Sequence, residues 1–171
     1  MLSHERRESL GIVTSRPLTE LLACPGPLEQ RLGAASQRRD YPAGALLFSQ
    51  GQECDGLYLL LTGEFTRSAQ RREKRLSLGV LHAGGLVELA GVLGDGRHNY
   101  SLSAATDAAA LVFPMGTLLH AFLEYPPLRM HLLEELGREV SRAYGAVYQP
   151  RKTRIRHIEA VSVGYPTSNL T

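Results

Sequence analysis

The chain has 171 residues, of which 43% are hydrophobic and 21% charged, and its formal net charge is +2. This size suits one folded domain with some additional helix, and the composition is that of a packed, soluble protein. No stretch approaches the roughly 18 consecutive apolar residues of a membrane span, and the start "MLSHERRESLG" lacks the apolar core of a secretory signal. We therefore expect a cytoplasmic protein with no membrane association.

Residues 1–40 are expected to form a weakly helical N-terminal segment. Leucines recur at spacings of three and four on both sides of Pro25-Gly26-Pro27. Such spacing indicates the apolar face of a helix, and the Pro-Gly-Pro break divides it into two short helices.

Residues 41–114 have the texture of an antiparallel β-structure. Short apolar runs alternate with glycine-containing turns, which is typical of a β-roll or jelly roll. No long helical stretch separates two strands, which argues against a parallel sheet. The basic run "RSAQRREKR" (67–75) reads as an exposed turn between two strands. The expected strands cover 45–49, 57–61, a segment from Glu64, 75–81, 100–106 and 110–114.

Two helices are expected at residues 115–149, a short one followed by a long one that Pro126-Pro127 opens and Pro150 ends. The long helix carries an apolar stripe, which either packs on its own β-domain or forms a seam with a second copy of the chain. We expect a homodimer, because the stripe is longer than a small β-domain can cover. Residues 150–171 are predicted to be a basic, flexible tail. The predicted dimer interface is Leu132, Leu136, Val140, Ala143 and Val147.

The order of these elements and the stretches "YPAGALLFSQGQECDGLYLLLTGEFTRS" (41–68) and "LHAGGLVELAGVLGDGRHNYSLSAATDAAALVFP" (81–114) resemble the cyclic nucleotide-binding domain of the Crp/Fnr regulator family. The resemblance covers about residues 40–148. It implies a mainly β fold, an antiparallel β-roll with short N-terminal helices and a long C-terminal dimerisation helix. It also implies that the second stretch occupies the place of the family's phosphate-binding cassette.

The cassette is the candidate ligand site. Because Val87, Leu89, Val92 and Leu93 make it apolar, it is either closed by its own side chains or takes another small or lipophilic ligand. Gly84 and Gly85 allow the backbone to approach a ligand, and a helix start favours an anion. The candidate ligand-binding residues are Gly84, Gly85, Val87, Glu88, Leu89, Arg97, His98, Asn99 and Tyr100.

This cassette departs from the family pattern at its charged positions. Binding members have Gly-Glu at the start of the cassette helix, for the ribose, and later an arginine for the cyclic phosphate. Aligned without gaps, Glu88 occupies the glycine position and Leu89 the glutamate position, while His98 occupies the arginine position and Arg97 lies one residue early. On a strand, a shift of one residue reverses the direction of a side chain. A one-residue deletion or a bulge near "GDGR" (94–97) would restore both Glu88 and Arg97.

Other chemistries find little support in the sequence. Cys24 and Cys54 lie far apart, without the Cys or His spacing of a zinc site, and the six histidines include no HxH pair. No nucleophile motif indicates an enzyme. The 21 residues after Pro150 show no helix-turn-helix, so sequence-specific nucleic-acid binding by this chain is not expected. We predict no catalytic residue, no metal and no cofactor.

The sequence thus predicts a non-enzymatic regulatory or sensor domain of the cyclic nucleotide-binding type, dimeric and with a degenerate phosphate-binding cassette. One alternative is a true receptor for cyclic AMP or cyclic GMP. A second is an adaptor that binds only protein.

Overall fold

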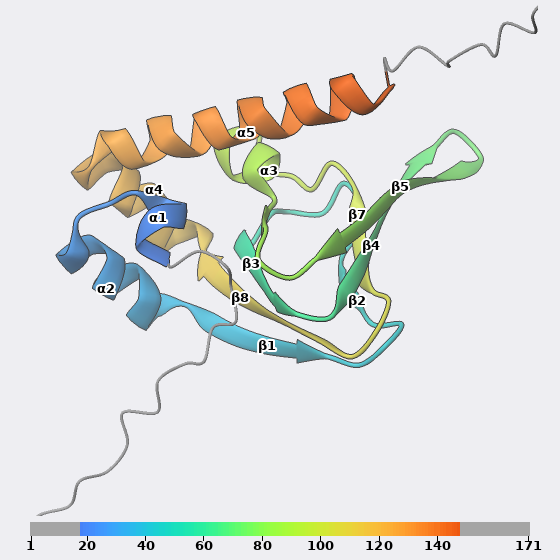
Figure 1. The fold of residues 1–171 in the computed structure, drawn as a ribbon, viewed down its shortest axis with the longest axis horizontal. Helices are drawn as coiled ribbons and strands as arrows, with labels where there is room; N and C mark the ends of the chain where they lie inside the picture. Colours follow the sequence, from blue (N-terminus) through green and yellow to red (C-terminus); the bar gives the residue numbers. More distant parts are fainter. Residues whose placement is uncertain (1–17, 148–171) are drawn as a thin grey trace, which may run out of the picture.

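The structure, a computed structural model, describes residues 18–147 (Figure 1). The predicted basic tail, 150–171, lies outside the described residues. Eight strands form two four-stranded antiparallel sheets with the orders β1-β8-β3-β6 and β2-β7-β4-β5. The strands are β1 (Gln37–Tyr41), β2 (Leu46–Phe48), β3 (Gly56–Thr62), β4 (Glu64–Arg71), β5 (Lys74–His82), β6 (Leu86–Val87), β7 (Ser101–Ala104) and β8 (Ala108–Pro114).

Within the part of the chain that the structure describes, five helices accompany the sheets. Helices α1 and α2 precede the roll, α3 interrupts it, and α4 and α5 follow it, with α5 crossing above α3 in Figure 1. The predicted mainly β architecture, an antiparallel β-roll with short N-terminal helices and a long C-terminal helix, is confirmed. The helices are α1 (Leu18–Leu22), α2 (Gly26–Ala35), α3 (Leu89–Leu93), α4 (Met115–Glu124) and α5 (Pro126–Val147).

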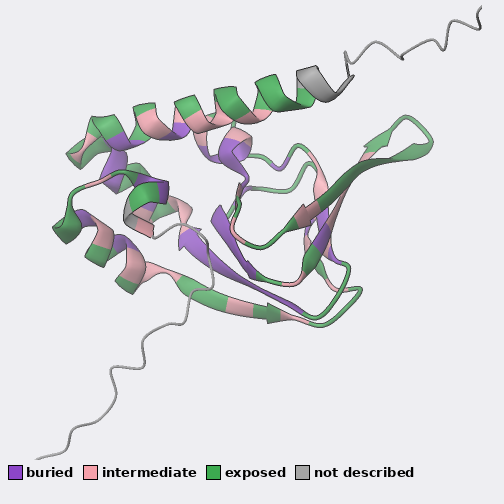
Figure 2. Ribbon diagram, in the orientation of Figure 1, coloured by how far each residue is buried: buried purple, intermediate pink, exposed green. Residues whose placement is uncertain are grey.

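Strands β3 and β8 are the centre of the molecule because both of their faces are covered. In β3, Leu57 and Leu59 pack beneath the helices, whereas Tyr58 and Leu60 pack inside the roll. Successive strand residues point to opposite faces, so a strand covered on both sides is apolar throughout. This explains the uninterrupted run "GLYLLL", and Figure 2 shows both strands as buried ribbon.

The first half of α5 belongs to the same core. Leu128 and Leu132 are fully buried against the helical side of the sheet, together with residues of α1, α2 and α4. Farther along, Val140 is exposed. The helix therefore leaves the core partway along its length.

Three features differ from the expected elements. The basic run 67–75, expected as an exposed turn, lies mostly in strands, because β4 continues to Arg71 and β5 begins at Lys74. Gln37–Asp40, predicted as part of the helical segment, form most of β1, a strand at the edge of its sheet that pairs with β8. The sequence "QRRDY" has no apolar alternation because neither face of this edge strand is deeply buried. Strand β6 was not among the expected strands, because its two residues are too few to show an alternation of apolar and polar side chains.

No helix within residues 18–147 combines the length and the apolar character that crossing a membrane requires.

Candidate functional site

A cavity of about 440 Å³ lies between the cassette and α5. This volume is within the range of small-molecule sites, which is about 300–1,000 Å³. Four of the predicted site residues line it, and so does Ala143 of the predicted dimer stripe. The four are Gly84, Gly85, Val87 and Leu89.

Two arginines line this cavity, Arg67 from β4 and Arg142 from α5, and Arg67 has the contacts that bear on a ligand. Its guanidinium donates a hydrogen bond of 3.0 Å to Glu139 of α5 and lies 5.5 Å from the centre of the Tyr100 ring. Its Nε is buried and has no hydrogen-bond partner within residues 18–147. Arg67 thus joins the β-roll to α5 and keeps one donor unused.

Sequence reasoning missed Arg67 because it begins the basic run that reads as an exposed turn. The signal that could have found it is the pairing of β4 with β7, which places Arg67 opposite Leu102, close to Tyr100. That register depends on tertiary structure.

Glu88 turns into the protein interior and does not line the cavity. It is the residue before α3, and its backbone has φ 75°, in the left-handed region. Glycine adopts this conformation without strain, whereas other residues rarely do. The left-handed backbone agrees with the gapless alignment, in which Glu88 occupies a glycine position.

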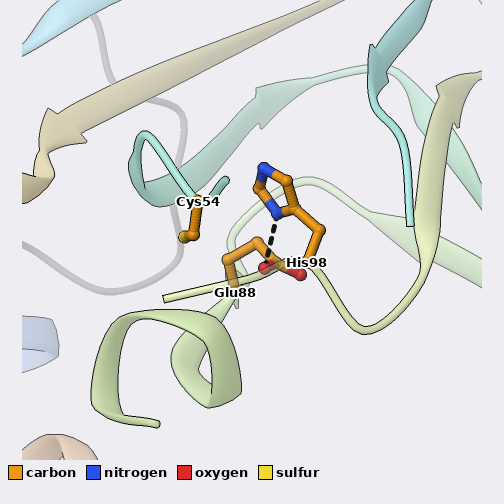
Figure 3. A group of neighbouring side chains, drawn as sticks. All are labelled: Cys54, Glu88 and His98. Atoms are coloured by element: carbon orange, nitrogen blue, oxygen red, sulfur yellow. Dashed lines mark hydrogen bonds and ion pairs between the residues drawn. The ribbon is translucent and has the colours of Figure 1, made fainter. Parts of the chain in front are cut away.

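The Glu88 carboxylate and the His98 imidazole form a buried pair (Figure 3). Glu88 Oε2 lies 2.6 Å from His98 Nδ1, and both residues are only 3% exposed. The His98 ring also stacks on Phe48, with 3.9 Å between ring centres and 6° between planes. Burial raises the pKa of Glu88, and the hydrogen bond from His98 opposes that rise.

Cys54 completes a cluster of three buried side chains with Glu88 and His98 (Figure 3). Its thiol contacts the Gly56 carbonyl at 3.4 Å, and burial, followed by the charge of Glu88, raises its pKa to about 12. Sequence reasoning missed this cluster because its members lie 34 and 10 residues apart along the chain, with no motif spacing.

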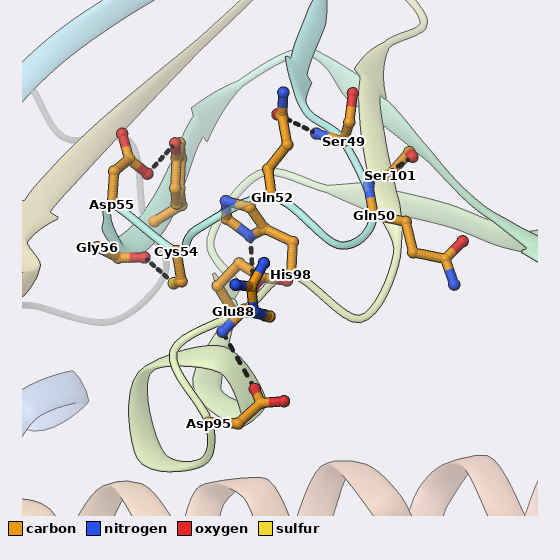
Figure 4. A network of polar contacts seen from close by, with 12 residues as sticks. Ser49, Gln50, Gln52, Cys54, Asp55, Gly56, Glu88, Asp95, His98 and Ser101 are labelled. Atoms are coloured by element: carbon orange, nitrogen blue, oxygen red, sulfur yellow. Dashed lines mark hydrogen bonds and ion pairs between the residues drawn. The ribbon is translucent and has the colours of Figure 1, made fainter.

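The turn that carries Cys54 is held against the loop that carries His98 (Figure 4). His98 N donates to the Gln52 carbonyl at 2.9 Å, and Cys54 N donates to the Gly96 carbonyl at 2.7 Å. These backbone bonds hold the two segments that carry Cys54 and His98 together.

Arg97 lies on the surface side of the same loop. Its side chain is exposed and donates to the Gly51 carbonyl at 2.8 Å, and it does not line the cavity. Asn99 is exposed, and Tyr100 is half-buried against Arg67. The structure therefore does not bring Glu88 and Arg97 together around one ligand, and it separates both from Gly84 and Gly85.

The predicted dimer stripe is divided by the fold. Leu132 is fully buried and Leu136 packs against the same core, so these two side chains serve the domain itself. Val140 and Ala143 are exposed, and the side chain of Val147 lies outside what the structure describes.

Comparison with known proteins gives the family of this fold. A sequence profile of the cyclic nucleotide-binding domain matches residues 38–125, slightly more than half of the chain. No curated protein matches the sequence.

Solved structures share the fold at low sequence identity. The catabolite activator protein of Thermus thermophilus aligns with 23% identity and a TM-score of 0.64, over 77% of this chain and 62% of that protein. The sensor domain of the transcriptional regulator DNR from Pseudomonas aeruginosa aligns with 21% identity and a TM-score of 0.62, over 80% and 89% of the two chains. The c-di-GMP responsive global regulator CLP from Xanthomonas campestris aligns with 22% identity and a TM-score of 0.58, over 70% and 59%.

This chain spans less than two thirds of the length of the activator and of CLP. The profile match extends from β1 through α4 and includes the cassette. The chain belongs to the cyclic nucleotide-binding domain family.

Proposed function

We propose that this domain is a non-enzymatic regulatory sensor whose cassette has lost the charges that hold a cyclic nucleotide, and which dimerises along the outer part of α5. The buried bond between Glu88 and His98 carries this proposal. It directs the cassette carboxylate inward, away from the cavity where a ribose would lie. The aligned similarity to transcriptional regulators supports a regulatory role in place of catalysis.

The position of Arg97 supports the loss of nucleotide affinity. A cyclic phosphate needs a cation at the cassette, and the Arg97 guanidinium is engaged by Gly51 on the surface. Removing one partner of a buried charge pair weakens binding by about 2–5 kcal/mol. We therefore expect cyclic nucleotides to bind at millimolar concentration or not at all.

The cavity itself supports a sensing role for another small ligand. Apolar side chains such as Val87 and Leu89 line one side, and Arg67 supplies a buried Nε–H that can donate to an anionic group. Because α5 forms the opposite wall, a ligand that contacts both would favour one position of α5 over another. This is the coupling that a sensor needs.

Isothermal titration of the purified chain with cyclic AMP and with cyclic GMP, up to millimolar concentration, tests the proposal. We expect no saturable heat with either nucleotide. Saturable binding in the micromolar range would overturn the degenerate cassette.

Arg67→Met and Arg97→Ala then distinguish the two routes to a true receptor. Nucleotide binding that Arg97→Ala abolishes would mean that Arg97 turns into the cavity, as the bulge hypothesis requires. Binding that only Arg67→Met abolishes would favour a receptor in which β4, in place of the cassette strand, holds the phosphate. In a thermal-shift screen of anionic small molecules, a cavity ligand should stabilise wild type and Arg97→Ala but not Arg67→Met.

A further inference from the structure

Three side chains of different chemistry meet in the interior beside α3. Cys54 comes from the turn before β3, Glu88 from the residue that precedes α3, and His98 from the loop before β7. Their candidate ligand atoms all lie within 4.8 Å of one another, and each residue is at most 6% exposed. Figures 3 and 4 show the three converging from separate segments.

We infer that Cys54, Glu88 and His98 form a binding site for one divalent transition-metal ion of the zinc class. A thiolate, an imidazole nitrogen and a carboxylate oxygen are the three ligand types that zinc takes in proteins. Mg²⁺ and Ca²⁺ prefer oxygen ligands only, so the thiol argues against both.

The geometry needs small adjustments to close around an ion. Tetrahedral zinc, with bonds of about 2.0–2.3 Å, places its ligand atoms about 3.3–3.6 Å apart. Glu88 Oε2 and His98 Nδ1 are 2.6 Å apart, joined by a hydrogen bond, and would separate by about 1 Å. The three protein ligands leave one tetrahedral position for water or a small anion.

Proton balance is simple. The Cys54 thiol releases its proton to solvent and binds as thiolate. Nδ1 of His98 must present a lone pair, so the proton of its bond with Glu88 moves to Nε2 or to solvent. The two negative ligands then neutralise the charge of the ion, which a buried site requires.

Two neighbouring features fit a site of this kind. Gly91 leaves room for the cluster, because a Cβ there would lie 2.7 Å from Glu88 Oε2 and 3.1 Å from Cys54 Sγ. Glu88 also keeps a left-handed backbone, a conformation that persists only where the surroundings enforce it and that concentrates at functional sites. An ion here would tie the start of α3 to two other segments, and α3 packs against α5.

Cobalt(II) titration of the 171-residue chain, stripped of metal with EDTA and kept reduced, tests the inference. We expect one Co²⁺ per chain and a thiolate-to-cobalt charge-transfer absorption, with zinc displacing cobalt and raising the melting temperature. The matched pair of variants is Cys54→Ser and Cys24→Ser, because Cys24 is the other cysteine and lies outside the cluster.

Cys54→Ser should abolish the charge-transfer absorption and weaken zinc binding more than tenfold. Replacing even a residue that only hydrogen-bonds to a metal ligand lowers metal affinity about 10–100-fold. Cys24→Ser should change neither. The inference fails if wild type shows no thiolate-to-cobalt absorption, or if Cys24→Ser loses that absorption and Cys54→Ser keeps it. It also fails if zinc binds Cys54→Ser as tightly as wild type. If Cys54→Ser does not fold, Glu88→Gln and His98→Gln, checked by circular dichroism, provide the same comparison through loss of zinc affinity. Unchanged zinc affinity in these variants would equally overturn the inference.

Discussion

At the scale of single residues, the main feature of the cassette is the buried pair of Glu88 and His98. The Glu88 carboxylate, from a residue with left-handed backbone, is buried, bonded to an imidazole that stacks on Phe48, and absent from the lining of the cavity. The stability of the folded protein depends on the bond between Glu88 and His98, because a buried charge without its partner is strongly destabilising.

His98→Ala should therefore lower the free energy of unfolding by about 3 kcal/mol, from the lost partner of Glu88 and the lost ring contact. Urea denaturation in the presence of EDTA measures this effect without metal. Asn99→Ala, at the exposed neighbouring position, should stay within about 0.5 kcal/mol of wild type. Equal stability of the two variants would contradict the structural role of the pair.

Gly91 offers a second residue-scale test. An alanine Cβ there would meet Glu88 Oε2 at 2.7 Å, the Arg97 carbonyl at 3.0 Å and Cys54 Sγ at 3.1 Å. We expect Gly91→Ala to destabilise the protein by about 1–3 kcal/mol through overpacking. Gly137→Ala in α5, where a Cβ meets nothing within 4 Å, should stabilise by about 0.5–1 kcal/mol. Thermal unfolding of both variants checks the opposite signs, and a stabilising Gly91→Ala would mean that the cluster is looser than described.

At the scale of elements, α5 has two roles along one helix. Its first half fills the core through Leu128 and Leu132, and in its second half Val140 is exposed. The bond between Arg67 and Glu139 marks the transition between the two halves. A dimer along α5 would therefore use the second half.

Val140→Asp should convert the proposed dimer into a monomer, because it places a charge on the exposed apolar part of the stripe. Light scattering coupled to size-exclusion chromatography measures the mass. Ser141→Asp adds the same charge to an exposed position about 100° around the helix from Val140, and it should leave the mass unchanged. A Val140→Asp variant that remains dimeric would place the dimer interface elsewhere on the molecule.

At the scale of the whole molecule, two sheets share one roll, and the helices cover one side of it (Figures 1 and 2). Strands β3 and β8 are covered on both faces. Strand β5 is an edge strand, and three of its apolar side chains, Leu76, Leu78 and Val80, are 42–51% exposed. Local stability should follow this difference in burial.

Hydrogen exchange followed by mass spectrometry should therefore show the slowest exchange in β3 and β8, and exchange at least about tenfold faster in β5. The expected order follows from global unfolding at the centre and local opening at the edge. Protection of β5 equal to that of β3 would contradict this order and would indicate that a second chain covers its exposed leucines.

The sequence by itself determined the fold class and most element positions. Apolar runs punctuated by glycines predict antiparallel strands, leucines at helical spacing predict α1 and α2, and an apolar stripe predicts α5, since these periods reflect which face of an element is buried. Through the family resemblance, which gave the position of the cassette, it also singled out Gly84, Gly85, Val87 and Leu89, which line one cavity. The sequence did not predict the edge strand β1, because this polar strand has no deeply buried face and therefore no apolar alternation.

Only the tertiary structure decided which side chains meet. Arg67 reaches the cavity through strand register, and Cys54 joins Glu88 and His98 through loop pairing across 34 residues of chain. The direction of Glu88 follows from its backbone at φ 75°, and Leu132 belongs to the core because α5 packs on the helical side of the sheet. Periodicity along the chain reports burial of one element against another, whereas contacts between distant residues depend on how those elements are assembled.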